Sequence, residues 1–453
     1  MQGRIAVIKL RNLLLAAVGL TAAGCKSDFL TGGDLNTDPN RPSQATANQL
    51  FAASEGAIWA LLGSDPARVT GMWAREFAGG QNQYQSIYNY LYDEGIQSGF
   101  NIGLYAAGGL VDIVRAETIA KAENNFALLG IVQVQEAITM GTGADLFGDL
   151  VYSHALSNEE NPPLDNQLAV YDSVQKVLTA AVANMASTAA TSSPPVGSDL
   201  VYGGDTGLWT ALAHTLKARF YLHTAEVRPG AYAQALAEAQ QGISSDGGNY
   251  FGAFTTSAAE TNFYYQFEVT AGRAGYLIPD AQFVALLENR NDPRRAEYFN
   301  GGATRLSDAR LAPNFPQPFV TYDENTLIWA EAAYRTGNQA TALTKLNEER
   351  VNHGLAPEVL AGQQLLNEIL IEKYIADFQL GHEAWNDYKR TCTPNFAPTQ
   401  AGQKMPGRMY YDPNERFTNT NIPPAGQGFN GSRNPNDPAN AVSDGTGQAC
   451  LAG

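Results

Sequence analysis

The chain has 453 residues, of which 44% are hydrophobic and 16% are charged, and its formal net charge is −16 at pH 7. This composition is typical of a globular protein and excludes an intrinsically disordered one. The acidic balance disfavours nucleic acid and anionic lipid as partners. After residue 24 there is no apolar run of about 18 residues, so no membrane-spanning helix is expected there.

The N-terminus has the pattern of a bacterial lipoprotein export signal. Its basic residues are Arg4, Lys9 and Arg11, and the first 24 residues contain no acid. The apolar run 13–20 is too short to span a bilayer, and small residues then lead to Cys25. A thiol at this place can carry a diacylglyceryl group, and two or more acyl chains anchor a protein stably. We therefore expect a cleaved signal peptide at 1–24 and a lipid anchor with palmitate-type chains at Cys25. The alternative is an ordinary signal peptide followed by a chance cysteine.

The segment after the anchor predicts a tether followed by one domain. Residues 25–45 are rich in Gly, Pro, Asn and Asp, which favours a flexible, lipid-anchored tether. We expect 46–453 to form a single domain whose last part, from about residue 394, is irregular because of its Pro and Gly content. Cys392 and Cys450 are the other cysteines, and they could form one disulfide or stay unpaired. No Cys/His cluster has the spacing of a zinc site, so the sequence predicts no cofactor and no structural zinc.

Helical periodicity dominates the chain between residues 43 and 391. The predicted helices are 43–62, 99–119, 122–141, 167–187, 206–226, 231–242, 280–289, 322–336, 339–353 and 362–380. Two stretches are predicted to be helical hairpins: 209–242, with a turn at Pro229-Gly230, and 321–353, with a turn at Gly337-Asn338. Thr321 and Glu324 have the spacing of a capping box before the second hairpin. We therefore predict a mostly α fold of tetratricopeptide-like helix pairs, an α-α superhelix with long looped insertions and little β structure.

Two insertions, 73–105 and 249–276, contain many aromatic and amide side chains without convincing helical spacing. A sugar ring stacks its apolar face on a flat side chain, and its hydroxyls suit Asn, Gln and Arg. The residues that we expect to contact a ligand are Trp73, Arg75, Asn82, Gln83, Tyr84, Tyr88 and Tyr264. Trp73 is singled out because the other tryptophans fall inside or against helical patterns. The alternative for any single tyrosine is a place in the core.

Catalytic patterns are weak. His382-Glu383 lacks the second histidine of a zinc protease, and there is no phosphate-binding glycine loop. Asp145 and Asp149 could imitate the carboxylate pair of a glycosidase, but a turn or capping role is favoured for them. The remaining histidines, at 154, 214, 223 and 353, are scattered and are interpreted as core or surface residues. The sequence therefore predicts a binding protein rather than an enzyme.

The C-terminal third carries a family resemblance. Residues 371–391 read IEKYIADFQLGHEAWNDYKRT, residues 404–416 read KMPGRMYYDPNER, and Asn419 and Asn421 follow. Further motifs lie at 146–156, where Val151 replaces the usual proline, at 291–294 and at 322–338. Their order resembles the SusD/RagB family of outer-membrane nutrient-binding lipoproteins. The resemblance implies a fold on four tetratricopeptide-like helix pairs, no catalytic activity, and a TonB-dependent outer-membrane barrel (SusC-like) as partner. The shared motifs are architectural, so no ligand residue is transferred from them.

Taken with Cys25, the resemblance predicts a lipid-anchored outer-membrane protein that faces the cell exterior. It would bind a glycan or another oligomeric nutrient, with a peptide as the alternative ligand, and pass it to the barrel. The rival hypothesis is a tetratricopeptide-like scaffold that organises envelope proteins and buries its aromatic residues. Glycoside hydrolysis through Asp145 and Asp149 is the third and least favoured hypothesis.

Overall fold

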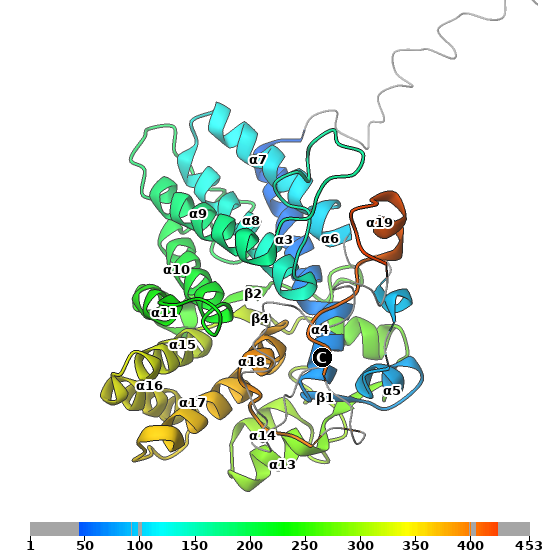
Figure 1. The fold of residues 1–453 in the computed structure, drawn as a ribbon, viewed down its shortest axis with the longest axis vertical. Helices are drawn as coiled ribbons and strands as arrows, with labels where there is room; N and C mark the ends of the chain where they lie inside the picture. Colours follow the sequence, from blue (N-terminus) through cyan, green and yellow to red (C-terminus); the bar gives the residue numbers. More distant parts are fainter. Residues whose placement is uncertain (1–44, 92, 98–101, 398, 400–404, 425–453) are drawn as a thin grey trace, which may run out of the picture. The chain divides into compact units, whose positions relative to one another are not determined.

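The computed structural model describes residues 45–91, 93–97, 102–397, 399 and 405–424 (Figure 1). These residues are mostly helical, with short strands paired in two-stranded sheets. The predicted signal peptide, Cys25, nearly all of the tether and Cys450 lie outside the described residues. Cys392 is disulfide-bonded.

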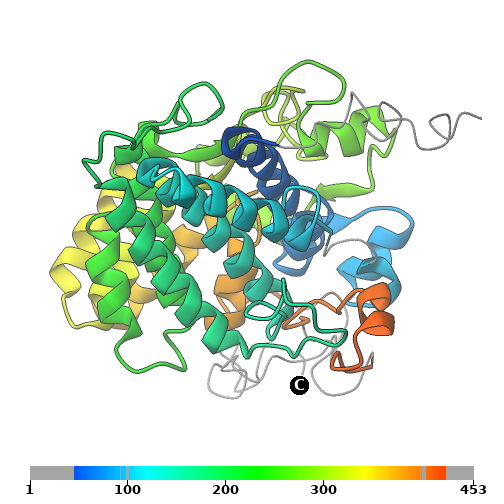
Figure 2. The ribbon, with the colours of Figure 1, turned by 90° about the horizontal axis from the view of Figure 1, so that it is seen from above.

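The first helices after the tether pack around one long buried helix, α8 (Phe126–Phe147). Nearly all of its side chains are buried, because α3 (Ala47–Gly63), α7 (Leu110–Ala122) and α9 (Gln167–Met185) all pack against it (Figure 2). The side chains of Asn125 and Asn166 cap α8 and α9 by accepting backbone N–H groups of the first turn. The predicted helix 99–119 is interrupted at 106–109, and the short helix α6 (Ile102–Tyr105) precedes the interruption.

Both predicted hairpins are confirmed. The first is α10 (Thr206–His223) with α11 (Ala231–Ala239), and the second is α15 (Tyr322–Arg335) with α16 (Gln339–Asn352). The backbone φ of Gly337, 91°, belongs to the tight turn of the second hairpin. The hairpins are far apart in sequence, yet α11 packs against α15, and small side chains such as Ala235 and Ala332 meet there. Helix α17 (Gly362–Ala376) packs against both helices of the second hairpin (Figure 1).

The capping box is half confirmed. The Thr321 hydroxyl accepts the backbone N–H of Glu324 at 3.1 Å. The Glu324 carboxylate pairs with Arg219 of α10, with N–O distances of 2.6 and 2.5 Å. A tertiary ion pair therefore uses the side chain that the sequence pattern assigned to the cap.

Residues 73–105 contain helices that the sequence analysis did not predict. These are the end of α4 (Asp65–Trp73), α5 (Gln83–Tyr88) and the 3-10 turn η1 (Glu94–Gln97), whereas α6 lies within the predicted helix 99–119. Strand β1 (Phe77–Gly79) pairs antiparallel with β3 (Leu277–Pro279), and β2 (Tyr250–Gly252) pairs antiparallel with β4 (Gln317–Val320). The remaining short elements are η2 (Asp246–Gly248), α12 (Phe263–Tyr265), the π-turn η3 (Gln266–Thr270), α13 (Ala281–Asn289), α14 (Arg294–Tyr298), α18 (Glu383–Thr391) and α19 (Pro413–Thr418).

The C-terminal motifs attach the end of the chain to the helices. The Trp385 indole of α18 donates to the carbonyl of Pro406 at 3.0 Å, and the Tyr411 hydroxyl donates to the carbonyl of Asp149 at 2.5 Å. Arg408 is buried and donates to the carbonyl of Phe147, the last residue of α8. All three bonds go to backbone carbonyls of the same chain, which agrees with an architectural role for the motif.

Candidate functional site

The two aromatic insertions form one packed substructure. Strand β1 belongs to the first insertion, and its partner β3 directly follows the second. Rings from the two insertions also meet: Phe77 lies 5.8 Å from Tyr264, and Tyr84 lies 5.0 Å from Phe267, measured between ring centroids. We call residues 65–91 and 263–280 the aromatic unit. The structure therefore joins segments that the sequence analysis could only treat separately.

Three of the predicted stacking residues are buried. Trp73, Tyr84 and Tyr264 expose 0%, 4% and 3% of their surface. Trp73 ends helix α4 and packs against Trp385, with ring centroids 5.7 Å apart. The expectation that Trp73 lies outside a helix is wrong. Helix α4 was missed because it is short and contains Pro66 and Gly71, which weaken its helical pattern. In this conformation none of the three rings presents a solvent-exposed face to a ligand.

Arg75 and Tyr88 meet at a third residue, Asp280. The Arg75 Nε donates to Asp280 Oδ2 at 2.7 Å, and its Nη2 donates to the Tyr88 hydroxyl at 2.7 Å. The Tyr88 hydroxyl donates to the same Asp280 oxygen at 2.6 Å, and the guanidinium lies 4.8 Å from the centre of the Tyr88 ring. Burial, and then the charge of Asp280, raise the pKa of Tyr88, so this hydroxyl stays a neutral donor. Tyr88 is partly exposed, whereas Arg75 and Asp280 are buried.

Asp280 was missed by the sequence analysis. Its Oδ1 caps α13 by accepting the N–H of Gln282 at 2.8 Å. A capping acid before the predicted helix 280–289 was readable from the sequence. The ion pair of Asp280 with Arg75 was not readable from the sequence, because the two residues are 205 positions apart.

Exposed amide side chains precede the partly exposed Tyr88 in the sequence. Gln81, Asn82, Gln83 and Gln85 are all exposed, and we call these four residues the amide rim. Asn82 precedes α5, but its side chain does not cap the helix. Three non-glycine residues of the aromatic unit, Arg75, Asn82 and Tyr90, have positive φ angles of 66°, 51° and 59°. Such conformations cost free energy and gather at functional sites. Of the predicted site residues, Asn82, Gln83 and Tyr88 are thus the ones accessible to a ligand.

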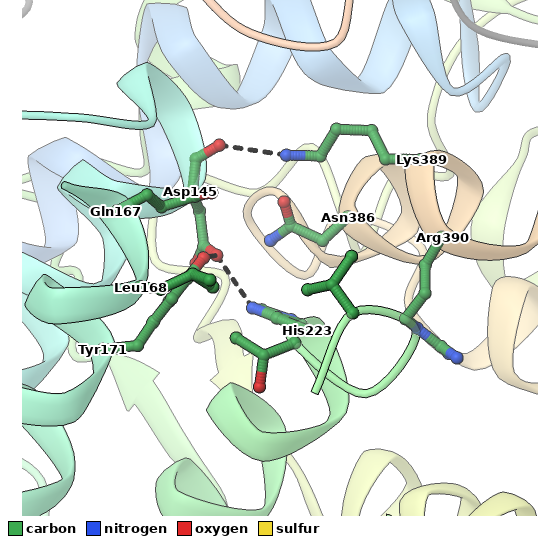
Figure 3. A pocket seen from close by; sticks show the side chains of 10 residues that line it. Asp145, Gln167, Leu168, Tyr171, His223, Asn386, Lys389 and Arg390 are labelled. Carbon is green, nitrogen blue, oxygen red and sulfur yellow. Dashed lines mark hydrogen bonds and ion pairs between the residues drawn. The ribbon is translucent and has the colours of Figure 1, made fainter. Parts of the chain in front are cut away.

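A second group of polar side chains lies between α8, α10 and α18 (Figure 3). His223 Nδ1 is 2.8 Å from Asp145 Oδ1, and His223 Nε2 is 2.9 Å from Glu383 Oε2. Burial alone would lower the pKa of His223, but the charges of Asp145 and Glu383 outweigh it and raise the pKa to about 9. The histidine is therefore an imidazolium that donates one N–H to each carboxylate. The Tyr171 hydroxyl also donates to Asp145.

The cavity beside this buried group is small, and the candidate carboxylates Asp145 and Asp149 have partners within the chain. The cavity beside it measures about 20 Å³, which is room for about one water, whereas ligand pockets measure several hundred Å³. Asp149 adds to the capping of α9 by Asn166, because its Oδ1 accepts the backbone N–H of Gln167, the first residue of the helix, at 2.8 Å. The capping role favoured for Asp149 is confirmed. The turn or capping role favoured for Asp145 is wrong, because Asp145 lies inside α8 and is hydrogen-bonded to His223 and Tyr171.

Comparison with known proteins gives the family. No curated protein matches the chain. A chitin-binding SusD homologue from Flavobacterium johnsoniae is 17% identical, with a TM-score of 0.66, and the match covers 84% of this chain and 97% of that one. A SusD-like protein from Bacteroides thetaiotaomicron is 19% identical, with a TM-score of 0.68 and coverage of 83% and 93%. A SusD homologue from Bacteroides fragilis is 18% identical, with a TM-score of 0.67 and coverage of 90% and 98%. These likenesses establish the fold.

Two further findings concern membrane-spanning helices and the protein family. No helix among the described residues has both the length and the apolar character needed to cross a membrane. The SusD-like family model, described as starch-binding and associating with the outer membrane, matches residues 39–412. The match spans most of the chain, and the chain therefore belongs to the SusD-like family.

Proposed function

We propose that the protein is a non-catalytic lipoprotein of the outer membrane that binds an oligosaccharide at the cell exterior and delivers it to a TonB-dependent barrel. The observation that carries this proposal is the family match over residues 39–412, whose description names starch binding and the outer membrane. Chitin binding by a structural neighbour supports a glycan as the ligand class.

The ligand surface that we propose is the amide rim together with Tyr88. Asn82 and Gln83 are exposed and can donate to and accept from vicinal hydroxyls. Tyr88 is partly exposed, and the orientation of its hydroxyl is fixed by Arg75 and Asp280. The buried rings of Trp73, Tyr84 and Tyr264 would have an indirect role in this proposal. Their packing against neighbouring rings would hold the segment that carries the amides in place. Preorganisation of this kind lowers the entropy lost on binding.

The membrane part of the proposal depends on Cys25 and on residues 26–45. Acyl chains on Cys25 would anchor the protein, and the tether would let the domain move relative to its partner barrel. Support comes from the basic and apolar pattern before Cys25 and from the outer-membrane association in the family description.

Binding is tested by titrating the purified protein with starch oligosaccharides, chitin oligosaccharides and proline-rich peptides in a calorimeter. The test variant combines Asn82→Gly with Gln83→Ala, because glycine accepts the φ of 51° without strain. Gln364→Ala, an exposed amide on α17, is the matched control. We expect one glycan to bind, the control to bind equally, and the double variant to lose affinity about tenfold, or about 1.4 kcal/mol.

Three outcomes would oppose parts of this proposal. Equal affinity of the double variant and the wild type would remove the amide rim as the site. Binding of the peptides alone would change the ligand class. If nothing binds, the burial of Trp73, Tyr84 and Tyr264 would favour the envelope scaffold instead.

Anchoring and delivery are tested separately. Labelled palmitate should enter the wild type but not Cys25→Ser, and the barrel should copurify with the wild-type protein. Cys25→Ser should bind the glycan normally and fail to support its uptake. Loss of glycan binding in Cys25→Ser would contradict this separation of roles.

A further inference from the structure

Three side chains converge at the open end of the α15–α16 hairpin, away from the turn at Gly337. Asp323 lies in the first turn of α15, Glu349 lies in the last turn of α16, and His353 follows α16 directly. His353 Nε2 is 3.2 Å from Asp323 Oδ2 and 3.0 Å from Glu349 Oε1. One imidazole nitrogen therefore faces two carboxylate oxygens.

A hydrogen bond accounts for only one of these two approaches. Nε2 carries at most one hydrogen, and its hydrogen bond is to Asp323. The Glu349 side chain is fully buried, yet neither of its oxygens has a hydrogen-bond donor among the described residues. A buried carboxylate without a donor is unfavourable, and such groups call for an unseen water or ion.

The nearest other cation does not supply the missing partner. Arg294 Nη1 is 3.8 Å from Glu349 Oε1, beyond hydrogen-bond range. The same guanidinium already donates to both oxygens of Asp292 and to Glu372. Asp292 and Glu372 thus take the hydrogen bonds of this guanidinium, and Glu349 has only the longer ion-pair contact to Nη1.

We propose that Asp323, Glu349 and His353 bind a zinc-type divalent cation. A tetrahedral ion with bonds of about 2.0–2.2 Å sets its ligand atoms about 3.3–3.6 Å apart. The observed 3.0 and 3.2 Å are slightly shorter, and all three ligand atoms lie within 4.8 Å of one another, so small side-chain shifts would admit the ion. His353 would bind in its neutral form through Nε2, each carboxylate would give one oxygen, and water would complete the shell. A nitrogen ligand disfavours Ca²⁺ and Mg²⁺, which prefer oxygen.

The proposed metal site is open to solvent, and a bound ion there would stabilise the hairpin. The side chains of Asp323 and His353 are 24% and 22% exposed, so an ion can enter from solvent. Because the ligands come from the start of α15 and the end of α16, a bound ion would join the two helices at the end opposite their turn. This inference is independent of the proposed glycan site.

The experiment uses the purified full chain after treatment with EDTA. We expect calorimetry to show one Zn²⁺ per chain, Zn²⁺ to raise the melting temperature by a few degrees, and Ca²⁺ to have no such effect. His353→Gln and Asp323→Asn should each weaken Zn²⁺ binding at least tenfold. His154→Gln, which removes an exposed imidazole paired with Glu159, is the matched control and should bind Zn²⁺ as the wild type does.

Cobalt gives a readout on the wild type that does not depend on any variant folding. Bound Co²⁺ should show the intense visible absorption of a tetrahedral site, and Zn²⁺ should remove it by competition. The proposal is overturned if the wild type binds neither ion, if Co²⁺ shows only the weak bands of octahedral water, or if His353→Gln folds and binds Zn²⁺ unchanged. In each of these cases the cluster is an imidazolium between two carboxylates.

Discussion

The helix pairs and the aromatic unit are stabilised by different kinds of interaction. Between the helices, charges are buried in matched sets, such as Arg219 with Glu324 and Arg390 with Glu331. In the aromatic unit, rings fill much of the interior, and the buried pair of Arg75 with Asp280 lies beside the partly exposed Tyr88. The helix pairs should therefore be sensitive to the loss of a charge, and the aromatic unit should tolerate changes at its rim. The predictions below test this difference, from the largest expected effect on stability to the smallest.

The largest effect is expected from Arg219→Met. This substitution leaves the fully buried Glu324 without the guanidinium that donates to both of its oxygens. Breaking a buried pair by removing one partner costs about 3–5 kcal/mol. Denaturant unfolding should show this loss, and the double variant Arg219→Met with Glu324→Gln should recover part of it. Arg305→Met, which breaks an exposed pair with Asp308, should change stability by less than about 1 kcal/mol. Equal losses in the two single variants would refute the contrast between buried and exposed pairs.

The second effect is a pH dependence from His223. The folded protein raises the pKa of this histidine, whose side chain is buried, from 6.5 to about 9. Its stabilisation is therefore complete below pH 6.5 and is lost as the pH rises to about 9. The free energy involved is about 3 kcal/mol. Unfolding measured from about pH 6 to about pH 9.5 should show this decline in the wild type, and His223→Gln should show a smaller decline, because His353, whose pKa is also raised, keeps its own contribution. A parallel pH profile in both proteins would mean that His223 is neutral in the folded state.

The sequence could predict the features that depend on local pattern, and it could not predict those that depend on contacts between distant residues. The helices α10, α11, α15 and α16 repeat apolar residues at helical spacing and are joined by turns at Gly230 and Gly337, so local pattern was sufficient for them. The pairing of β1 with β3 joins Phe77 to Pro279, far apart in the chain, and no local pattern encodes it. Trp73 was misassigned for the same reason, because its burial depends on Trp385.

The proposed metal ligands could be predicted only in part, because two of them share a local pattern and the third does not. Glu349 and His353 are four residues apart at the end of a predicted helix, and this spacing places them on one face. That signal was present in the sequence but was not used. Asp323 could not be assigned to the pair without the packing of α15 against α16.

The third effect lies inside the aromatic unit. Tyr84→Phe retains the ring that packs on Phe267 but removes the hydroxyl that accepts from Arg68 Nε at 3.2 Å. Loss of a buried hydrogen bond to a charged group costs about 1.5–3 kcal/mol. Thermal or denaturant unfolding should show this loss, whereas Tyr276→Phe, at a partly exposed tyrosine nearby, should be nearly neutral. A loss as large as that of Arg219→Met would remove the distinction between the two regions.

The smallest effect on stability is expected at the rim, where glycine and alanine at position 82 can be compared. Asn82 has a φ of 51° and a ψ of −138°, a conformation that glycine adopts freely and alanine adopts at a cost of about 1–3 kcal/mol. Asn82→Ala should therefore unfold more easily than Asn82→Gly, which should differ little from the wild type. Both variants lose the same amide, so their affinity for the glycan should fall equally. If affinity instead follows stability, so that only Asn82→Ala binds weakly, the amide makes no contact with the ligand and the backbone conformation of the rim is what the ligand recognises.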